Sequence, residues 1–450
     1  MIRSPEAREG WVSLAAIVLS GAVVVTCSAT RAREVATPAP PPAPEAPLVA
    51  SVAPPAPVST PAPLASAAPI ASAPAKRDPL GKLALPRFYA AADELRAGKR
   101  ASHVRVVWLG DSHTMADLWT GVVRKALVAK LGSGGPGFVH AGFDAKRYRH
   151  DGVHTDLLAK WNAAPVPYSK MKREDDGVFG LGGVRFAPAE GEAHAIVEVL
   201  ADGAPRGDAL TWDLAYRAGD GAALRVALPG TEATLRGEDP SGPGGIRHHR
   251  FRTASATGKL DVAAIAGLPE LFGVTVEGET PGLVLDTIGL NGARVGTFLA
   301  WDRDAWVAEL ARRAPSLVVL AFGTNESADR DVPAERYRAA MSALLERARA
   351  AAPESDCLVI TPIDRPGADY AARLADITRG FEESAKLAGC ATWSALAAMG
   401  GHGSMEAWSH ESPPRSGQDG IHLTPKGYQW LGERLARDLA FGLGGKPDPL

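Results

Sequence analysis

Apolar runs and helix-like spacings alternate along two parts of the chain. Arg105–Leu109 is an apolar run that stops at Gly110, and Met115–Leu131 then carries apolar residues at helical spacing. The first pattern is typical of a buried parallel strand and the second of a helix packed on it. The alternation returns later, with strands expected at Leu317–Phe322, Cys357–Ile360 and Ala391–Ser394 and helices at Ala334–Ala351, Asp369–Leu387 and Pro425–Phe441. This pattern predicts a parallel sheet covered by helices on both faces, with an active site at the carboxyl ends of its strands.

The middle of the chain has a different pattern. Residues 151–284 contain short strand-like runs separated by turn signals such as Asp202-Gly203, with no helical spacing between them. Such a pattern predicts an antiparallel β-sandwich. We therefore expect an all-β module at 151–284, inserted into an α/β domain made of residues 79–150 and 285–445. The predicted strands of the module are Gly183–Phe186, Ala195–Leu200, Leu224–Leu228, Leu260–Ala263 and Leu271–Val276.

A mainly apolar run lies close to the N-terminus. It spans 15 residues, 11–25, behind Arg3 and Arg8. A membrane-spanning helix needs about 20 residues, so the run favours the apolar part of an export signal. It ends just before Cys27 in a context that resembles a bacterial lipoprotein signal, in which the cysteine is lipidated; an uncleaved anchor and an ordinary cleaved signal are the alternatives. We expect residues 1–27 to direct export and to tether the chain on the periplasmic side of a membrane or at the cell surface.

Residues 28–78 read as a linker. Within them, residues 37–75 contain 13 prolines, many alanines and a single charge, Glu45. This composition cannot build a core and favours extended polyproline II. The segment is either a stalk that holds the folded body away from a membrane or plain disordered sequence, and both leave a body that starts near residue 79.

Charge and composition narrow the function classes. Of the 450 residues, 49 are Lys or Arg and 51 are Asp or Glu, a net charge of −2 that argues against a nucleic-acid binder. Apolar residues at 46% and charged residues at 22% are ordinary for a soluble protein. The three cysteines form no C-x-x-C spacing, and no H-E-x-x-H occurs, so we expect no metal site.

Candidate chemistry follows the first predicted strand, in the sequence Gly110-Asp-Ser-His113. Ser112 stands where the strand stops and a helix begins, so its hydroxyl would be exposed above the sheet. Free backbone N–H groups at a helix start can stabilise an anion there. Taken alone, Gly-Asp-Ser is also compatible with a polar turn.

A nucleophilic serine needs a general base, and the base needs an acceptor on its other ring nitrogen. Asp419-Gly-Ile-His422 offers both, just before the last predicted helix. A surface histidine is the alternative, and His402 and His410 also lie in this region. Only His422 combines the Asp spacing with a loop at the carboxyl edge of the sheet.

Two further strand ends could supply donors to an oxyanion. Asn325, in Gly323–Glu326, could direct its side-chain amide at developing negative charge. Gly292, in Ile288–Ala293, could offer an unobstructed backbone N–H. A loop-capping asparagine and a simple glycine turn are the alternatives, and Gly289 stands close to Gly292.

In combination and order, these blocks resemble the SGNH (GDSL-type) hydrolases. The resemblance implies a flavodoxin-like three-layer α/β fold with Ser112 as nucleophile and Asp419 and His422 completing a triad. It also implies an oxyanion hole formed by Ser112, Gly292 and Asn325. The chain departs from the family pattern with GDSH in place of GDSL and GTNE where many members have G-x-N-D.

Within that superfamily, GDSHTMADLWTG, GSGGPGFV, LFGVTVE and IGLNGAR resemble the bacterial peptidoglycan O-acetylesterases. Those enzymes carry a carbohydrate-binding type β-sandwich between the serine and glycine blocks. The resemblance implies a serine esterase that removes short acyl groups, acetyl foremost, from cell-wall or other polysaccharide without a metal or organic cofactor. An O-acetyltransferase, a lipid or xylan esterase, and a tethered sugar-binding protein with an inactive site are the alternatives.

We expect structural roles for the two remaining cysteines and for four aromatic residues. Cys357 and Cys390 lie at the starts of neighbouring predicted strands and could form a disulfide in an oxidising compartment, or remain buried thiols in the cytoplasm. Aromatic residues in a β-sandwich are more often core than sugar platforms. We therefore expect packing roles for Trp212 and Tyr216 in the module, and for Trp301 and Trp306 after the glycine block.

Overall fold

The computed structural model describes residues 83–164, 176–189, 191–207, 209–238, 240–330 and 332–444. The expected signal segment with Cys27 and the linker at 28–78 lie outside the described residues. Among the helices of the described part, none combines the length and apolarity that a membrane crossing requires.

A five-stranded parallel sheet forms the centre of the folded body, as the apolar runs predict. Its strand order is β13-β1-β14-β15-β16, and the central pairs run in register from Val106–Leu317 to Gly110–Ala321. All five strands end at the same edge, where the loops with the candidate residues begin. The strands are β1 (Val104–Gly110), β13 (Leu283–Gly289), β14 (Leu317–Ala321), β15 (Asp356–Thr361) and β16 (Ala391–Ser394).

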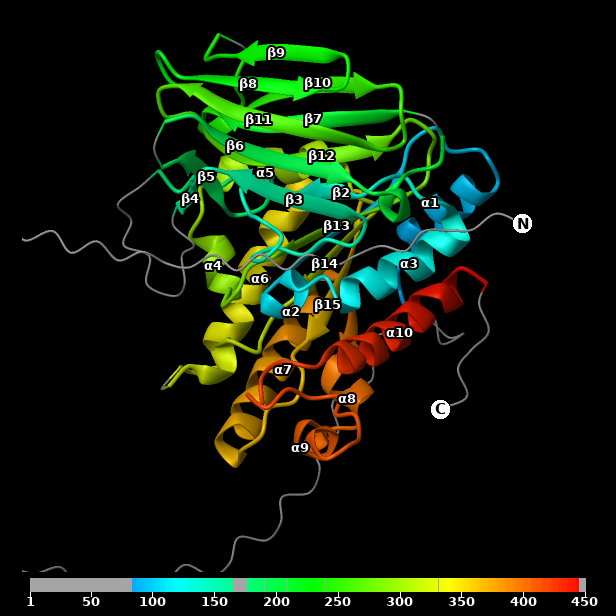
Figure 1. Cartoon of the computed structure of the whole chain (residues 1–450). Coiled ribbons are helices and arrows are strands. Elements are labelled where there is room, and N and C mark those ends of the chain that lie inside the picture. The colour runs from blue at the N-terminus through cyan, green and yellow to red at the C-terminus, as the bar shows by residue number, and fades with distance from the viewer. Residues whose placement is uncertain are drawn as a thin grey trace, which may run out of the picture. The chain divides into compact units, whose positions relative to one another are not determined.

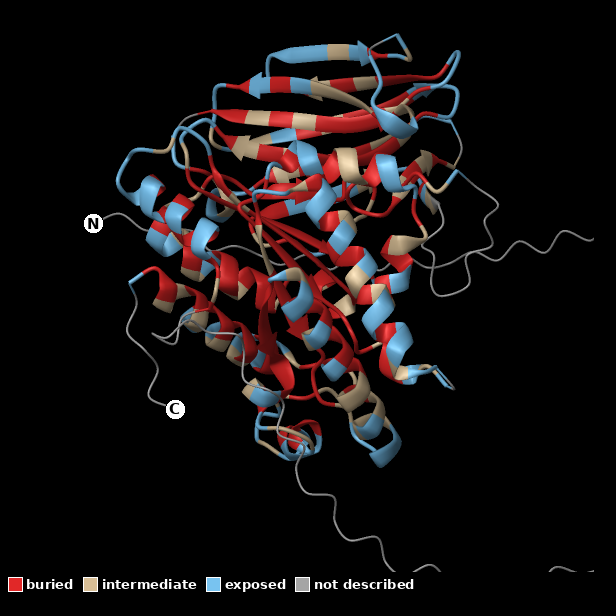
Figure 2. Cartoon of the chain, turned by 180° about the vertical axis from the view of Figure 1, so that it is seen from behind, coloured by how far each residue is buried: buried red, intermediate tan, exposed pale blue. Residues whose placement is uncertain are grey.

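Helices cover both faces of this sheet (Figure 1). Val106 and Trp108 of β1 pack with the helices on one face, and Val107 and Leu109 pack on the other. Buried positions fill the sheet and the helix surfaces turned toward it (Figure 2). The first face carries α1 (Pro86–Arg96), α3 (Trp119–Leu131), α8 (Ala395–Met399), α9 (Ser404–Ser409) and α10 (Pro425–Gly442); the second carries α5 (Arg303–Arg313), α6 (Ala334–Ala351) and α7 (Ala368–Ala388), with α4 (Val295–Leu299) against α6.

An all-β insert separates β1 from β13, as expected. It consists of two antiparallel sheets, ordered β10-β7-β12-β5-β4 and β3-β6-β11-β8-β9. The first sheet also takes in β2 (Gly137–Val139), which pairs with β12 although it precedes residue 151. The other strands are β3 (Val153–Leu158), β4 (Trp161–Ala164), β5 (Arg185–Pro188), β6 (Ala193–Val199), β7 (Leu210–Arg217), β8 (Ala223–Leu228), β9 (Thr231–Leu235), β10 (Arg247–Thr253), β11 (Gly258–Ala266) and β12 (Glu270–Gly278), with 3-10 turns η1 (Ala201–Gly203) and η2 (Pro243–Gly245).

The helix expected at Met115–Leu131 begins later in the structure, at Trp119, and ends at Leu131 as predicted. The stretch Met115–Leu131 contains a break between α2 (Ser112–Met115) and α3, where Asp117 adopts a left-handed conformation with φ 47°. The Asp117 carboxylate is fully buried and accepts hydrogen bonds from Thr120, from Arg124 and from the backbone N–H of Asp151. These bonds compensate the unfavourable backbone conformation, which costs on the order of 1–2 kcal/mol. The predicted start at Met115 was therefore wrong.

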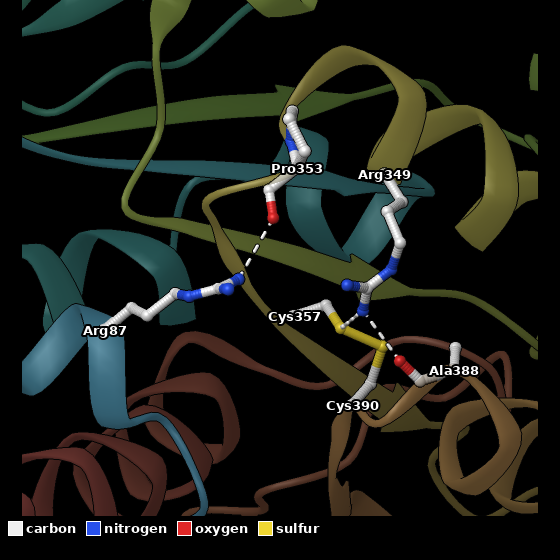
Figure 3. The surroundings of a disulfide bond; sticks show 6 residues. All are labelled: Arg87, Arg349, Pro353, Cys357, Ala388 and Cys390. Carbon is white, nitrogen blue, oxygen red and sulfur yellow. Dashed lines mark hydrogen bonds between the residues drawn. A yellow bond between two sulfur atoms is a disulfide. The ribbon is translucent and has the colours of Figure 1, made fainter.

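A disulfide joins Cys357, at the start of β15, to Cys390, which directly precedes β16 (Figure 3). Their sulfur atoms are 1.99 Å apart. The guanidinium of Arg349 lies beside the bridge and donates to the carbonyl oxygen of Ala388 at 2.7 Å. The disulfide thus links the amino ends of two neighbouring strands, at the edge of the sheet opposite the candidate residues.

Candidate active site

Ser112 is the first residue of α2 and follows β1 after one capping residue. The side chain of that residue, Asp111, accepts the backbone N–H of His113 at 3.0 Å, and its carbonyl accepts the N–H groups of Thr114 and Met115. These bonds fix the turn tightly. Within the described part of the chain, the backbone N–H of Ser112 has no acceptor, so it is free to bind an anion.

Ser112, His422 and Asp419 form one continuous chain of hydrogen bonds. The Ser112 Oγ lies 2.9 Å from Nε2 of His422, and Nδ1 of His422 lies 2.6 Å from Oδ2 of Asp419. Since Nδ1–H donates to the carboxylate, Nε2 accepts the serine O–H. The structure therefore brings these three residues together with the orientation that proton removal from Ser112 requires.

The turn that carries the base also fixes its orienting carboxylate. Asp419 Oδ1 accepts the backbone N–H groups of Ile421 and His422, each at 2.9 Å. Partial burial acts to raise the pKa of Asp419, but the hydrogen bonds from the ring and backbone of His422 outweigh it and lower the pKa to about 2. Asp419 is therefore ionised at neutral pH and stabilises the imidazolium that forms when His422 takes a proton.

Asn325 lies in the loop between β14 and the 3-10 turn η3 (Glu326–Ala328). Its side-chain amide donates to the carbonyl of Ala293 at 3.0 Å and, more weakly, to Asp111 Oδ2 at 3.4 Å. The first bond ties the asparagine loop to the loop that carries Gly292. The second hydrogen, held at long distance, is the one available for an oxyanion.

The two glycines after β13 have different structural roles. A Cβ on Gly289 would lie 2.1 Å from the backbone nitrogen of Met115, so this glycine permits α2 to pack closely on β13. Gly292 lies in the following loop with φ +72°, a conformation that favours glycine. Among the described residues its N–H has no acceptor, so it is available as a donor.

Glu326 was not predicted as a site residue, although it stands where many members of the family have an aspartate. Its carboxylate is buried and accepts the backbone N–H of Val295 at 2.8 Å and that of Gly323 at 3.1 Å. These two bonds join the loops that carry Gly292 and Asn325. Burial raises the pKa of Glu326 to about 7, against the opposing effect of the Val295 hydrogen bond.

A second buried carboxyl, that of Asp111, lies in the same region. Burial raises its pKa to about 8, and the charge of Glu326 adds to the rise. Near neutral pH these two carboxyls are therefore largely or partly protonated. A neutral Asp111 holds the Asn325 amide less firmly than a carboxylate would.

His113 and Tyr428 also lie at the candidate site, although the sequence analysis did not predict them as site residues. The His113 ring lies 5.3 Å from the His422 ring, centre to centre, and its Nδ1 is 2.7 Å from the hydroxyl of Tyr428. Burial, followed by the charge of His422, lowers the pKa of His113 to about 3. A neutral imidazole therefore lies against the base. The histidine in the unusual GDSH motif was the only sequence feature that pointed to this arrangement.

The other residues discussed from the sequence lie in structural positions. His402 contacts the buried Asp364, with 3.2 Å between Nδ1 and Oδ1, and His410 is exposed at the end of α9. The aromatic side chains expected in the core are all buried: Trp212, Tyr216, Trp301 and Trp306. Within the described ranges, no group of three or more His, Cys, Asp or Glu residues could hold a metal ion.

A comparison of the sequence with family profiles finds a match over part of the chain. Residues 264–430 match the profile of the GDSL-like lipase/acylhydrolase family. The match contains Gly292, Asn325, Asp419 and His422 but not Ser112, because the insert separates the serine segment from the rest. No curated protein sequence matches the chain.

Structural comparison extends the likeness over the folded body. A structure described as a peptidoglycan O-acetylesterase in action is 21% identical, covers 80% of this chain and 97% of its own, and superposes with a TM-score of 0.66. A lipase/acylhydrolase from Enterococcus faecalis is 17% identical, covers 38% of this chain and 80% of its own, and has a TM-score of 0.28. A family two carbohydrate esterase from Clostridium thermocellum in complex with cellohexaose is 10% identical, covers 57% of this chain and 96% of its own, and has a TM-score of 0.27. Coverage of 80% exceeds what the parallel-sheet domain supplies alone, so the first likeness includes the insert.

The parallel sheet, its two helical layers and the position of the insert define the SGNH-hydrolase fold. The chain therefore resembles the GDSL-like lipase/acylhydrolases in both sequence and fold, as its motifs predict.

Proposed function

We propose that this protein is an esterase that removes acetyl groups from O-acetylated peptidoglycan, with Ser112, His422 and Asp419 as its catalytic triad. The observation that carries the proposal is the unbroken hydrogen-bond chain from Ser112 Oγ through His422 to Asp419. The substrate assignment is supported by the relative of known activity, described as a peptidoglycan O-acetylesterase.

In this mechanism, Ser112 Oγ attacks the ester carbonyl while His422 Nε2 takes the serine proton. The N–H groups of Ser112 and Gly292 and the amide of Asn325 bind the oxyanion; losing one such donor costs roughly 10²–10³ in rate. His422 then returns the proton to the departing sugar hydroxyl, which leaves an acyl-serine. Water, deprotonated by His422, releases acetate and restores Ser112.

The solvent exposure of His422 and Asp419 favours hydrolysis over transfer of the acetyl group to a second sugar. The side chains of Asp419 and His422 are 48% and 42% exposed. Water therefore reaches the acyl-serine directly. A transferase would need to exclude water at this position.

The test compares acetate release from O-acetylated peptidoglycan by the chain and by its Ser112→Ala variant. We expect release by the unchanged protein and a loss of at least about 10³-fold in the variant. Aryl acetates are assayed in parallel. Hydrolysis of aryl acetate with no release from peptidoglycan would retain the triad and reject the wall substrate, and unchanged activity of Ser112→Ala would reject the triad.

We further propose that the enzyme works outside the cytoplasm, tethered through Cys27. The Cys357–Cys390 disulfide supports an oxidising compartment. The check is fractionation of cells that express the full chain, with mass analysis of the mature N-terminus. An unmodified chain in the cytoplasmic fraction would reject the proposal.

A further inference from the structure

Two arginines beside the candidate active site have no acidic partner. Arg365 lies in the loop after β15, and Arg373 lies in the second turn of α7. Among the described residues, neither guanidinium has a carboxylate oxygen within 4.0 Å, although both side chains are partly buried. By contrast, Arg105 binds the carboxylate of Glu277 and the buried Arg313 binds that of Asp286.

Both guanidiniums lie over the same ring. The carbon centres of Arg365 and Arg373 are 3.9 Å and 5.4 Å from the centroid of Tyr370. Arg365 also donates to Ser327 Oγ at 2.9 Å, and Arg373 donates to the carbonyl of Asp329 at 2.6 Å. These contacts hold two like charges close together, which is unfavourable without an anion between or beside them.

Each arginine retains binding capacity. Nε of Arg373 is buried and has no hydrogen-bond partner. Burial, followed by the charge of Arg373, lowers the pKa of Arg365. A bound anion would offset the repulsion between the two arginines, because the accessible N–H groups of a planar guanidinium can donate to a carboxylate.

This pair adjoins the catalytic residues on two sides. Ser327, which holds Arg365, is two positions after Asn325. On the other side, Pro366, the residue after Arg365, packs against Gly420. A Cβ added at Gly420 would lie 2.9 Å from the Pro366 side chain, so the loop that carries Arg365 contacts the Asp419–His422 turn. The charge of Asp419 also acts on Arg365. The first turn of α7, with its outward N–H groups, adds positive potential at the same edge.

We propose that Arg365 and Arg373 form an anion subsite that binds a carboxylate of the polymer whose ester Ser112 attacks. This inference rests on the proposed function and narrows its substrate to acidic glycans. Peptidoglycan carries carboxylates on its peptide stems, and pectin carries them on its uronic acids. Neutral acetylated mannan has none.

The experiment measures kcat and KM of Arg365→Gln and Arg373→Gln on O-acetylated peptidoglycan, acetylated pectin, acetylated mannan and an aryl acetate. Arg379→Gln is the matched control, because Arg379 lies on the same helix, is exposed and pairs with Asp376. We expect each subsite variant to lose about 10-fold or more in kcat/KM on the acidic polymers, mainly through KM, as for a lost charge-assisted hydrogen bond. Activity on mannan and aryl acetate should stay within about twofold.

Ionic strength provides an independent readout. Salt should raise KM of the unchanged enzyme for the acidic polymers and should affect the Arg365→Gln variant less. Equal losses on all four substrates, or no loss on the acidic ones, would overturn the subsite. If the unchanged enzyme cleaves aryl acetate but not peptidoglycan, the wall substrate fails, and the comparison of pectin with mannan still tests the arginines.

Discussion

Tyr428 links the segment of the nucleophile to that of the base. His113 follows Ser112, and its Nδ1 lies 2.7 Å from the hydroxyl of Tyr428, in the helix that follows the His422 loop. Tyr428 keeps its proton, since burial raises its pKa, and it can donate to the neutral His113. This contact connects the serine turn to the histidine loop and limits rotation of the base.

Removal of the Tyr428 hydroxyl should therefore slow the reaction. We expect Tyr428→Phe and His113→Leu each to lower kcat on aryl acetate about 10-fold, since a buried donor or acceptor left unpaired costs about 1–3 kcal/mol. The double variant should be no slower than either single one, because both remove the same contact. Fully additive losses in kcat would contradict the coupling, and thermal unfolding of all three variants separates misfolding from misplacement.

The two buried carboxyls predict a pH dependence of stability. The folded-state pKa of Asp111 is raised to about 8 and that of Glu326 to about 7, well above their values in an unfolded chain. Each of these two carboxyls therefore binds more protons in the folded state than in the unfolded state from about pH 4 up to its folded-state pKa, and its contribution to stability falls as pH rises through that range. Glu326→Gln should remove the part of this fall that lies below about pH 7 and leave the contribution of Asp111 between about pH 7 and pH 8. Denaturant titrations at pH 5, 6, 7 and 8 measure it, and a steeper slope in the variant would argue against this origin.

At the scale of elements, periodicity predicts well what depends on burial alone. The helix expected at Ala334–Ala351 has those bounds, and the expected strands lie in the central sheet or the insert. The break at Asp117 could not be predicted this way, because it depends on hydrogen bonds to partners as distant as Thr287, 170 positions away. For the same reason, the sequence does not predict that Tyr428 is the partner of His113, which lies 315 positions earlier in the chain.

The disulfide is an element-scale feature whose effect should be on stability alone. It closes a loop across 33 positions. In the chain-entropy account, replacing Cys357 and Cys390 by serine should cost about 3–4 kcal/mol of unfolding free energy. Because the bridge lies at the amino ends of the strands, kcat on aryl acetate should change by less than about twofold. Urea unfolding and steady-state kinetics of the double variant check both, and a large kcat loss with unchanged stability would contradict this division.

At the scale of the whole folded body, buried charges join the insert to the parallel-sheet domain. Arg313 of α5 donates to Asp286 of β13 and to Glu277 of β12 at distances of 2.6–3.0 Å. Asp286 also accepts the backbone N–H of Phe138, in β2. Opposite charge lowers the pKa of Glu277 despite its burial. The sequence predicts an inserted module but not these contacts, which depend on three segments meeting in space.

The insert and the parallel-sheet domain should consequently unfold together. Calorimetry of the folded body should give one transition. Arg313→Ala should lower stability by about 3–5 kcal/mol because it leaves the buried Asp286 carboxylate without its arginine partner, whereas Glu277 keeps Arg105. The exposed control Arg379→Ala should change stability by less than about 1 kcal/mol. Two separate transitions in the unchanged protein would show that these contacts do not couple the modules.

The distance between nucleophile and base along the chain has a consequence for biosynthesis. Ser112 and His422 are separated by 310 positions, including the whole insert. At the usual elongation rates of roughly 5–20 residues per second, the ribosome needs roughly 15 to 60 s to go from one residue to the other. Throughout that interval the nascent chain carries a serine without its base. Translation must reach the last helix before any ester can be attacked, so a chain whose synthesis stops early is chemically silent.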